Sequence, residues 1–169
     1  MSVFETIDVD VLLEKEFAVD RQQAFDPFRF TGVPGWRVGW QDHLSLCLHR
    51  GTVGSALILE DALRDTETAI SNYEQHVRLR QSKHILLDAQ VFEVFYRHPG
   101  LFQGACKGKP GSDERHVYFN GTEIVSPDGV VHIACLYRFQ GYLRYKFERL
   151  THTTRGDITS LVIADHPFK

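Results

Sequence analysis

The chain has 169 residues, a hydrophobic share of 43% and a formal net charge of −3 at neutral pH. This length suits one globular domain over residues 1–169 with a sizeable core. The negative charge and the lack of a basic run argue against a nucleic-acid-binding surface. No apolar run approaches the roughly 20 residues that span a bilayer, and the acidic N-terminus predicts no signal peptide, so we expect no membrane contact.

The first half of the chain predicts one helix followed by strands. Residues 7–25 form a weakly amphipathic pattern that Asp26-Pro27 should end. Apolar and β-branched residues bounded by turn signals then predict strands. These strands cover residues 36–40, 44–49 and 55–59.

Residues 60–83 are ambiguous. They lack Gly and Pro as far as Gln81, which favours a helix by propensity, yet Tyr73, Gln75, Val77 and Leu79 alternate with charged residues as in a strand. After this segment, residues 84–95 predict a strand and residues 103–115 a loop.

The second half predicts two hairpins and a final strand. Residues 133–149 alternate aromatic and charged side chains around a turn at Gln140-Gly141. The second hairpin turns at Asn120-Gly121, the strongest short signal for a hairpin. With a last strand at 161–164, seven to nine short strands result. We therefore expect a mainly β fold, closed as an antiparallel barrel that holds a small ligand.

The cysteines and histidines carry little evidence of a metal or a disulfide. Cys47, Cys106 and Cys135 are an odd number at irregular spacing, which favours free thiols in a reducing compartment. His43 and His49, six residues apart, would lie about 20 Å apart on a strand, too far to share a metal. We therefore expect no metal site.

Several short stretches, taken in order, match one family pattern. They are Gln23-Ala24-Phe25, Leu59-Glu60-Asp61-Ala62, Tyr73-Glu74-Gln75-His76-Val77, Gly104-Ala105-Cys106, Ala134-Cys135, Tyr142-Leu143-Arg144-Tyr145-Lys146-Phe147-Glu148, Arg155-Gly156-Asp157 and His166-Pro167-Phe168. In this order the chain resembles the T-type (CpcT/CpeT) phycobiliprotein chromophore lyases. The resemblance implies a lipocalin-like (calycin) β-barrel with an N-terminal helix, in which residues 70–80 form a strand.

The resemblance also implies a function. Such a protein binds an open-chain tetrapyrrole, phycocyanobilin or phycoerythrobilin, and attaches it to a cysteine of a phycobiliprotein subunit. It would work in the cytoplasm, or in the plastid stroma of an alga, and a homodimer stays open. Glu60 and Asp157 are the candidate acid–base carboxylates, and Cys106, beside two lysines, is the candidate reactive thiol. The candidate bilin contacts are Tyr73, His76, Arg78, Arg80, Cys135, Tyr142 and Arg155.

Two alternatives remain. Glu74 and His76 stand where the family has arginines, which pair with carboxylates bidentately. This difference favours a non-enzymatic barrel that binds another hydrophobic ligand or serves as an assembly partner. If residues 62–82 are helical instead, the chain would be a two-layer α+β binding module.

Overall fold

The structure is a computed structural model that describes residues 16–53, 57–106, 115–151, 153–155 and 158–164. Its helices are α1 (Phe28–Thr31), α2 (His43–Leu46), α3 (Asn72–Gln81), α4 (Ala89–Arg97) and α5 (Pro99–Cys106). Its strands are β1 (Glu16–Ala18), β2 (Arg37–Gln41), β3 (Arg50–Thr52), β4 (Leu57–Glu60), β5 (Ala69–Ser71), β6 (Ile85–Leu86), β7 (His116–Val125), β8 (Val131–Phe139), β9 (Tyr142–Arg149), β10 (Thr153–Arg155) and β11 (Ile158–Ile163).

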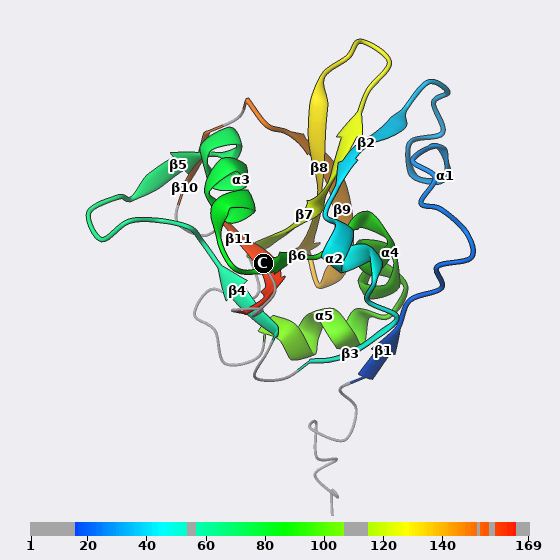
Figure 1. Ribbon diagram of the computed structural model, residues 1–169, viewed down its shortest axis with the longest axis horizontal. Helices are drawn as coiled ribbons and strands as arrows, with labels where there is room; N and C mark the ends of the chain where they lie inside the picture. Colours follow the sequence, from blue (N-terminus) through cyan, green and yellow to red (C-terminus); the bar gives the residue numbers. More distant parts are fainter. Residues whose placement is uncertain (1–15, 54–56, 107–114, 152, 156–157, 165–169) are drawn as a thin grey trace, which may run out of the picture.

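A mixed seven-stranded sheet forms the centre of the molecule (Figure 1). Its main order is β4–β11–β7–β8–β9, with β2 beside β7 and β6 beside β11. The β11–β7 pair is parallel and the other pairs are antiparallel. The expectation of a mainly β protein is confirmed, but the described strands do not close into a barrel.

Helices cover both faces of this sheet. In Figure 1, α3 and the β5–β10 pair lie on the left, and α2 and α4 lie on the right. On β8, Ala134 and Leu136 pack into the main core, whereas Ile133 and Cys135 belong to a second cluster on the opposite face. Both faces of the strand are therefore buried, which explains its nearly continuous apolar sequence.

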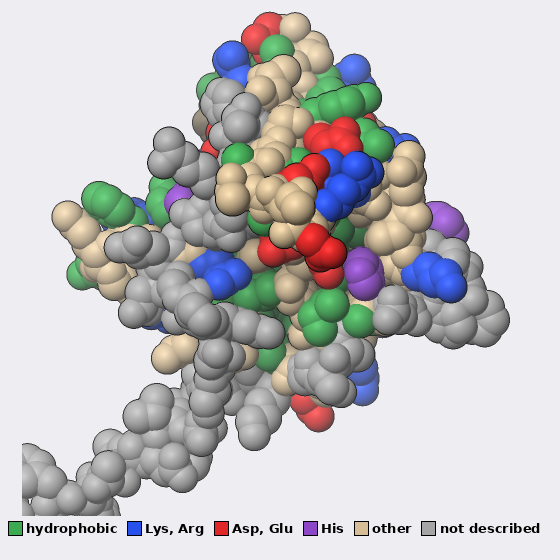
Figure 2. All heavy atoms as spheres, turned by 90° about the vertical axis from the view of Figure 1, so that its left-hand side faces the viewer, with side chains coloured by type: hydrophobic (Ala, Val, Ile, Leu, Met, Phe, Trp, Pro, Cys, Tyr) green, Lys and Arg blue, Asp and Glu red, His purple; other side chains and the backbone are tan. Residues whose placement is uncertain are grey.

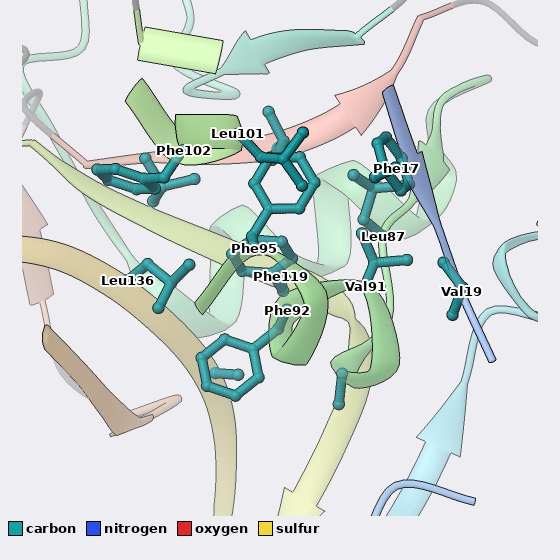
Figure 3. Close-up of a cluster of buried hydrophobic side chains, with 14 of the residues drawn as sticks. Phe17, Val19, Leu87, Val91, Phe92, Phe95, Leu101, Phe102, Phe119 and Leu136 are labelled. Atoms are coloured by element: carbon teal, nitrogen blue, oxygen red, sulfur yellow. The ribbon is translucent and has the colours of Figure 1, made fainter. Parts of the chain in front are cut away.

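Aromatic rings fill the main core on the α4 side (Figure 3). Phe92 and Phe95 of α4 meet Phe119 of β7 edge to face, with ring centroids 5.7 and 5.8 Å apart. All three side chains are fully buried. Burying each one stabilises the fold by about 1.5–3 kcal/mol, so this cluster fixes α4 against the sheet.

The strands predicted at 84–95 and at 70–80 are wrong except at β6 and at the last residues of β5. In the rest of both segments, side-chain caps begin helices. Asp88 accepts hydrogen bonds from the backbone of Gln90 and Val91 and starts α4. Ser71 accepts one from Glu74 N and starts α3. The helical alternative for the ambiguous segment is thus confirmed over Asn72–Gln81.

Other predictions had mixed outcomes. Residues 44–49 are not a strand, because Asp42 caps α2 there. The expected N-terminal helix is absent from the described residues 16–25. Residues 16–18 form strand β1 instead, and the Phe17 side chain lies in the main core between two exposed neighbours. The expected loop at 103–115 starts later, since α5 continues to Cys106 and residues 107–114 lie outside the described ranges. The remaining predicted strands, β2, β4, β8, β9 and β11, are present.

The Asn120-Gly121 pair is not a hairpin turn. It lies in a bulge within β7, where Phe119 faces Ala134 but Ile124 faces His132. Gly121 N donates to Leu87 O at 2.9 Å, and Asp42 N donates to Gly121 O at 2.8 Å. The pair therefore lies where β7 is hydrogen-bonded to two other segments, one at Leu87 and one at Asp42. Turn statistics describe only neighbouring residues, so they could not show this.

We predict that Gly121→Ala destabilises the protein strongly. A Cβ there would lie 2.0 Å from Leu86 O and 2.6 Å from the carbonyl carbon of Leu87. Since backbone rather than a flexible side chain is in the way, we expect a loss of more than about 3 kcal/mol in the free energy of unfolding, measured in urea. Gly129→Ala is the control: its φ is +82° but its surroundings are open, so it should cost about 1 kcal/mol. Equal losses would contradict the steric argument.

Candidate functional site

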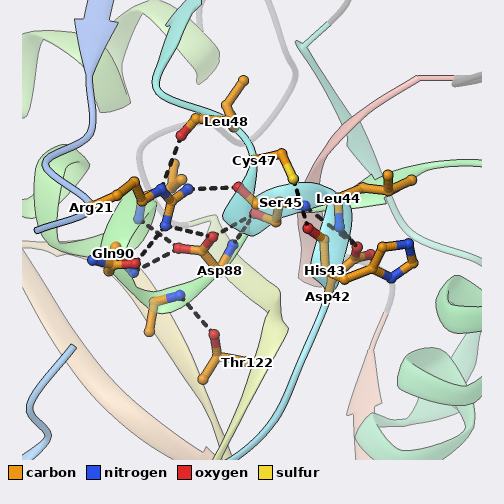
Figure 4. Close-up of polar contacts among 12 residues, drawn as sticks. Arg21, Asp42, His43, Leu44, Ser45, Cys47, Leu48, Asp88, Gln90 and Thr122 are labelled. Carbon is orange, nitrogen blue, oxygen red and sulfur yellow. Dashed lines mark hydrogen bonds and ion pairs between the residues drawn. The ribbon is translucent and has the colours of Figure 1, made fainter. Parts of the chain in front are cut away.

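Residues 19–27, called the strap here, join β1 to α1 and are held by one arginine (Figure 4). Arg21 donates to Asp88 at 2.9 Å and to the Gln90 side chain at 2.6 Å. It also donates to the backbone carbonyls of Ser45 and Leu48, at 2.6 and 3.0 Å. One guanidinium thus fixes the strap to α4 and to the segment around α2.

The Asp88 carboxylate is fully buried, and both of its oxygens accept hydrogen bonds. One oxygen caps α4, and the other accepts from Ser45 Oγ at 2.7 Å as well as from Arg21. Asp88 N in turn donates to Ser45 Oγ at 3.0 Å. Because every partner is engaged, this cluster is a structural support rather than a reactive centre.

Gln90 supplies the second attachment of the strap. Its side-chain amide donates to the carbonyl of Asp20 at 3.1 Å and to that of Gln23 at 2.6 Å. The strap therefore touches α4 through polar contacts near its start, while Phe25 anchors its far end in the aromatic core. Residues of the strap also line two hollows in the protein surface.

The larger hollow is a groove of about 680 Å³ between the strap, β2 and α2. Phe25, Val38 and Leu46 contribute apolar surface to it, and Gln41 and Arg37 contribute polar groups. Arg37 is exposed and has no ion pair or hydrogen bond through its side chain within the described residues. A free guanidinium beside apolar surface suits a ligand that carries a carboxylate on an apolar body.

A smaller hollow of about 270 Å³ lies on the other side of Gln90. Its two cationic side chains are already paired, since Glu93 binds Arg29 at 2.9 Å and Arg97 at 2.8 Å, and the remaining charge in its lining is the acidic Asp20. Without a free cation it has less to offer an anionic ligand. The groove with Arg37, called the Arg37 groove below, is therefore the candidate site.

Four of the residues predicted from the sequence, Tyr73, His76, Arg78 and Arg80, lie together on α3, outside the lining of the Arg37 groove. His76 is buried, and its Nε2 lies 3.0 Å from Glu123 Oε1. Arg80 pairs with the same oxygen at 3.1 Å and stacks over Trp40, 4.2 Å from the ring centroid. The hydrogen bond from His76, aided by Arg80, lowers the pKa of Glu123.

Arg78 is committed to neighbouring acids. It binds both oxygens of Glu67, at 2.5 and 2.9 Å, and Glu74 at 2.8 Å. The bidentate bond holds the pKa of Glu67 down at about 2. Figure 2, which faces the α3 side, shows acidic and basic side chains gathered against one another. A ligand carboxylate would have to displace these partners to reach Arg78.

The structure disperses the other predicted residues. Glu60 ends β4, on the α3 side, with a carboxylate oxygen 3.7 Å from His84 Nε2. Tyr142 is at the β8–β9 turn, far along the sheet, and is exposed. Asp157 lies outside the described residues, as does the side chain of Arg155 in β10.

Two of the three thiols are buried. Cys106 ends α5 within the main core, and burial raises the pKa of its thiol to about 11. Cys135 is completely buried on β8, and burial raises its pKa strongly. Cys47, which follows Leu46 at the groove, is exposed. Near neutral pH the first two thiols carry almost no thiolate, the form that reacts.

Sequence patterns did not point to the Arg37 groove. Its lining comes from residues 21–22 and 24–27 of the strap, from Arg37 and Val38, from Gln41 and Leu46, and from Gln90. No single stretch contains a motif, and only folding brings these segments together. Arg37 itself looks like an ordinary polar residue on an edge strand.

Comparisons with known proteins found no matching family model, curated protein or solved structure. Within the described residues, no helix is long and apolar enough to cross a membrane. In the same part of the chain, no three His, Cys, Asp or Glu residues are grouped as metal ligands.

We predict that Arg21→Met destabilises the protein by about 3–5 kcal/mol, because it leaves the buried Asp88 carboxylate without its cation. Urea unfolding measures this loss. Arg29→Met is the matched control, since Arg29 pairs with Glu93 at the surface and should cost less than about 1 kcal/mol. If both variants lose the same amount, the buried pair does not hold the strap.

Thiol labelling should separate the three cysteines. In the folded protein only Cys47 should react quickly with a disulfide reagent at pH 8, and Cys47→Ser should abolish the fast phase. Cys106, with a pKa of about 11, is only about 0.1% thiolate there and is also sterically shielded. All three should react in denaturant. Rapid labelling of Cys106 or Cys135 in the native state would contradict their burial.

Proposed function

We propose that the protein binds an amphipathic small molecule with a carboxylate in the Arg37 groove, and that this ligand is an open-chain tetrapyrrole. The observation that carries the proposal is the free guanidinium of Arg37 beside a groove of about 680 Å³. That volume lies within the range of about 300–1,000 Å³ typical of small-molecule sites. The resemblance to T-type chromophore lyases selects the tetrapyrrole within this class of ligand.

The groove matches the chemistry of a bilin in two respects. A guanidinium forms paired hydrogen bonds with a propionate carboxylate, and Arg37 makes no ion pair within the described residues, although Asp26 also lines the groove. Phe25, Val38 and Leu46 offer apolar contact for the pyrrole rings, while Gln41 offers an amide. This interpretation needs no closed calycin barrel, because the strap and β2 form the walls.

In this proposal the protein holds the bilin without a covalent bond and presents it to a phycobiliprotein subunit. The acceptor's own cysteine supplies the thiolate for attachment. The burial of Cys106 and Cys135 argues against attachment to either of these two predicted thiols, since both are almost un-ionised near neutral pH and are inaccessible. The lyase step would then depend on the acceptor's thiol and on the geometry of hand-over.

The test is a titration with phycocyanobilin and with phycoerythrobilin, followed by visible absorbance. We expect a sharpened, red-shifted band and micromolar affinity, with binding weakened about tenfold in Arg37→Ala, which loses a charge-assisted bond. Ala24→Trp, at an exposed strap position that lines the groove, should block binding without changing charge. Arg50→Ala, an exposed arginine on β3 outside the groove, is the control.

Two outcomes would overturn parts of the proposal. No spectral change with either bilin would rule out the tetrapyrrole. A second titration with anilinonaphthalene sulfonate, an amphipathic anion that fluoresces in apolar sites, then tests the groove itself. If that dye also fails to bind, or binds equally well to Arg37→Ala, the groove is not the binding site.

A further inference from the structure

Strand β9 leaves part of one edge of the sheet open. It pairs with β8 along its whole length, from Tyr142 opposite Phe139 to Arg149 opposite His132, and no other described strand pairs with it. The two-residue turn at Gln140-Gly141 makes Phe139 and Tyr142 a hydrogen-bonded pair. Every second residue after Tyr142 therefore directs its backbone N–H and C=O away from β8.

The far end of this edge is already occupied, and the bond to Arg149 agrees with that alternation. Asn72 Nδ2 donates to Arg149 O at 3.0 Å, and Tyr73 N donates to Leu150 O at 2.8 Å. The outward backbone groups of Leu143, Tyr145 and Phe147 have no backbone partner in the part of the chain that the structure describes. They form an unpaired stretch that a further strand could join.

Exposed aromatic rings stand at the start of this stretch. Phe139 and Tyr142 face each other across the hairpin and are 58% and 68% exposed. The guanidinium of Arg144 lies 5.7 Å from the centroid of the Tyr142 ring. Adjacent exposed aromatic side chains next to an arginine are typical of the central residues of protein interfaces.

The charge on this surface indicates the charge of the partner that would bind there. Arg144 and Lys146 share the face of β9 that carries Tyr142, and Arg144 has no acidic partner within the described residues. Lys146 pairs with Glu148, further along the strand. The end of the edge nearest the turn is therefore cationic, which favours an acidic ligand.

A second copy of the chain fits this edge poorly. Two β9 strands paired antiparallel over residues 143–147, centred on Tyr145, would set Arg144 opposite Lys146 twice. Like charges directly opposite each other destabilise a strand pair. Registers shifted toward Arg149 to avoid this repulsion need its carbonyl, which Asn72 already binds.

We propose that the β9 edge and the Phe139–Tyr142 tip dock an extended, acidic segment of a partner protein, which joins the sheet as an additional strand. Backbone hydrogen bonds to residues 143, 145 and 147 hold the segment in register. Arg144 and Lys146 attract its carboxylates, and the two rings cover its apolar side chains. This surface is separate from the Arg37 groove and does not depend on the function proposed there.

The first experiment uses a fluorescein-labelled ten-residue peptide of alternating Glu and Val, followed by fluorescence anisotropy without bilin. We expect binding that weakens as salt rises, and no binding of the equivalent Lys–Val peptide. Hydrogen exchange gives the position: the amides of Leu143, Tyr145 and Phe147 should become protected when the acidic peptide is present. Protection at another edge, or no binding of the acidic peptide, overturns the proposal.

Variants separate the contributions. Arg144→Glu should weaken peptide binding at least about tenfold, whereas Arg50→Glu, at an exposed position on β3, should leave it unchanged. Leu143→Pro removes one outward N–H, and Leu143→Ala is its control because it shortens the side chain but keeps the N–H. Equal binding by the proline and alanine variants would overturn the added strand.

The exposed Tyr142 also permits a test against nucleic acid. A ten-residue oligothymidylate offers stacking bases and phosphates to the same aromatic and cationic groups. We expect no binding of this probe at the salt concentration where the acidic peptide binds. Oligothymidylate binding that Arg144→Glu and Tyr142→Ser both abolish would assign the surface to nucleic acid instead and overturn the proposal.

Discussion

Two buried aspartates hold this structure together. Asp88 caps α4 and accepts from Ser45 and Arg21, so one carboxylate joins a helix, the segment around α2 and the strap. Asp42 caps α2, and its other oxygen accepts from Leu86 N at 3.2 Å, while its own N–H reaches the β7 bulge at Gly121. An apolar side chain could replace neither residue without leaving several buried donors unpaired.

The Arg37 groove follows from this support. Polar contacts fix the strap at Arg21 and Gln90, and an aromatic anchor, Phe25, fixes it further on. A chain held at separate points by directional bonds need not collapse onto the sheet, so space remains beneath it. The same rigidity keeps the walls of the groove in place before a ligand arrives, which lowers the entropic cost of binding.

On the opposite face, four of the residues predicted to contact a bilin are on a helix, and three of them bind acidic side chains of the protein itself. The resemblance predicts a strand over residues 70–80, on which His76, Arg78 and Arg80 would share one face. On α3 they spread around a helix: His76 turns inward to Glu123, Arg78 binds two acids, and Tyr73 faces solvent. The bulge in β7 brings Asn120 to the His76 ring, with Nδ2 and Nδ1 3.3 Å apart. These contacts tie α3 to the sheet.

The sequence by itself determined the mainly β class, the β8–β9 hairpin with its turn at Gln140-Gly141, and the strands β2, β4 and β11, because alternation and turn residues act over a few neighbouring positions. It misassigned α2 and α4, whose capping aspartates compete with strand-like apolar runs, and it took Asn120-Gly121 for a turn. Only the tertiary structure decided the sheet order, the burial of Cys106, and the grouping of the strap, Arg37 and Gln90 around one groove. These features depend on contacts between residues far apart in the chain, for which no local pattern exists.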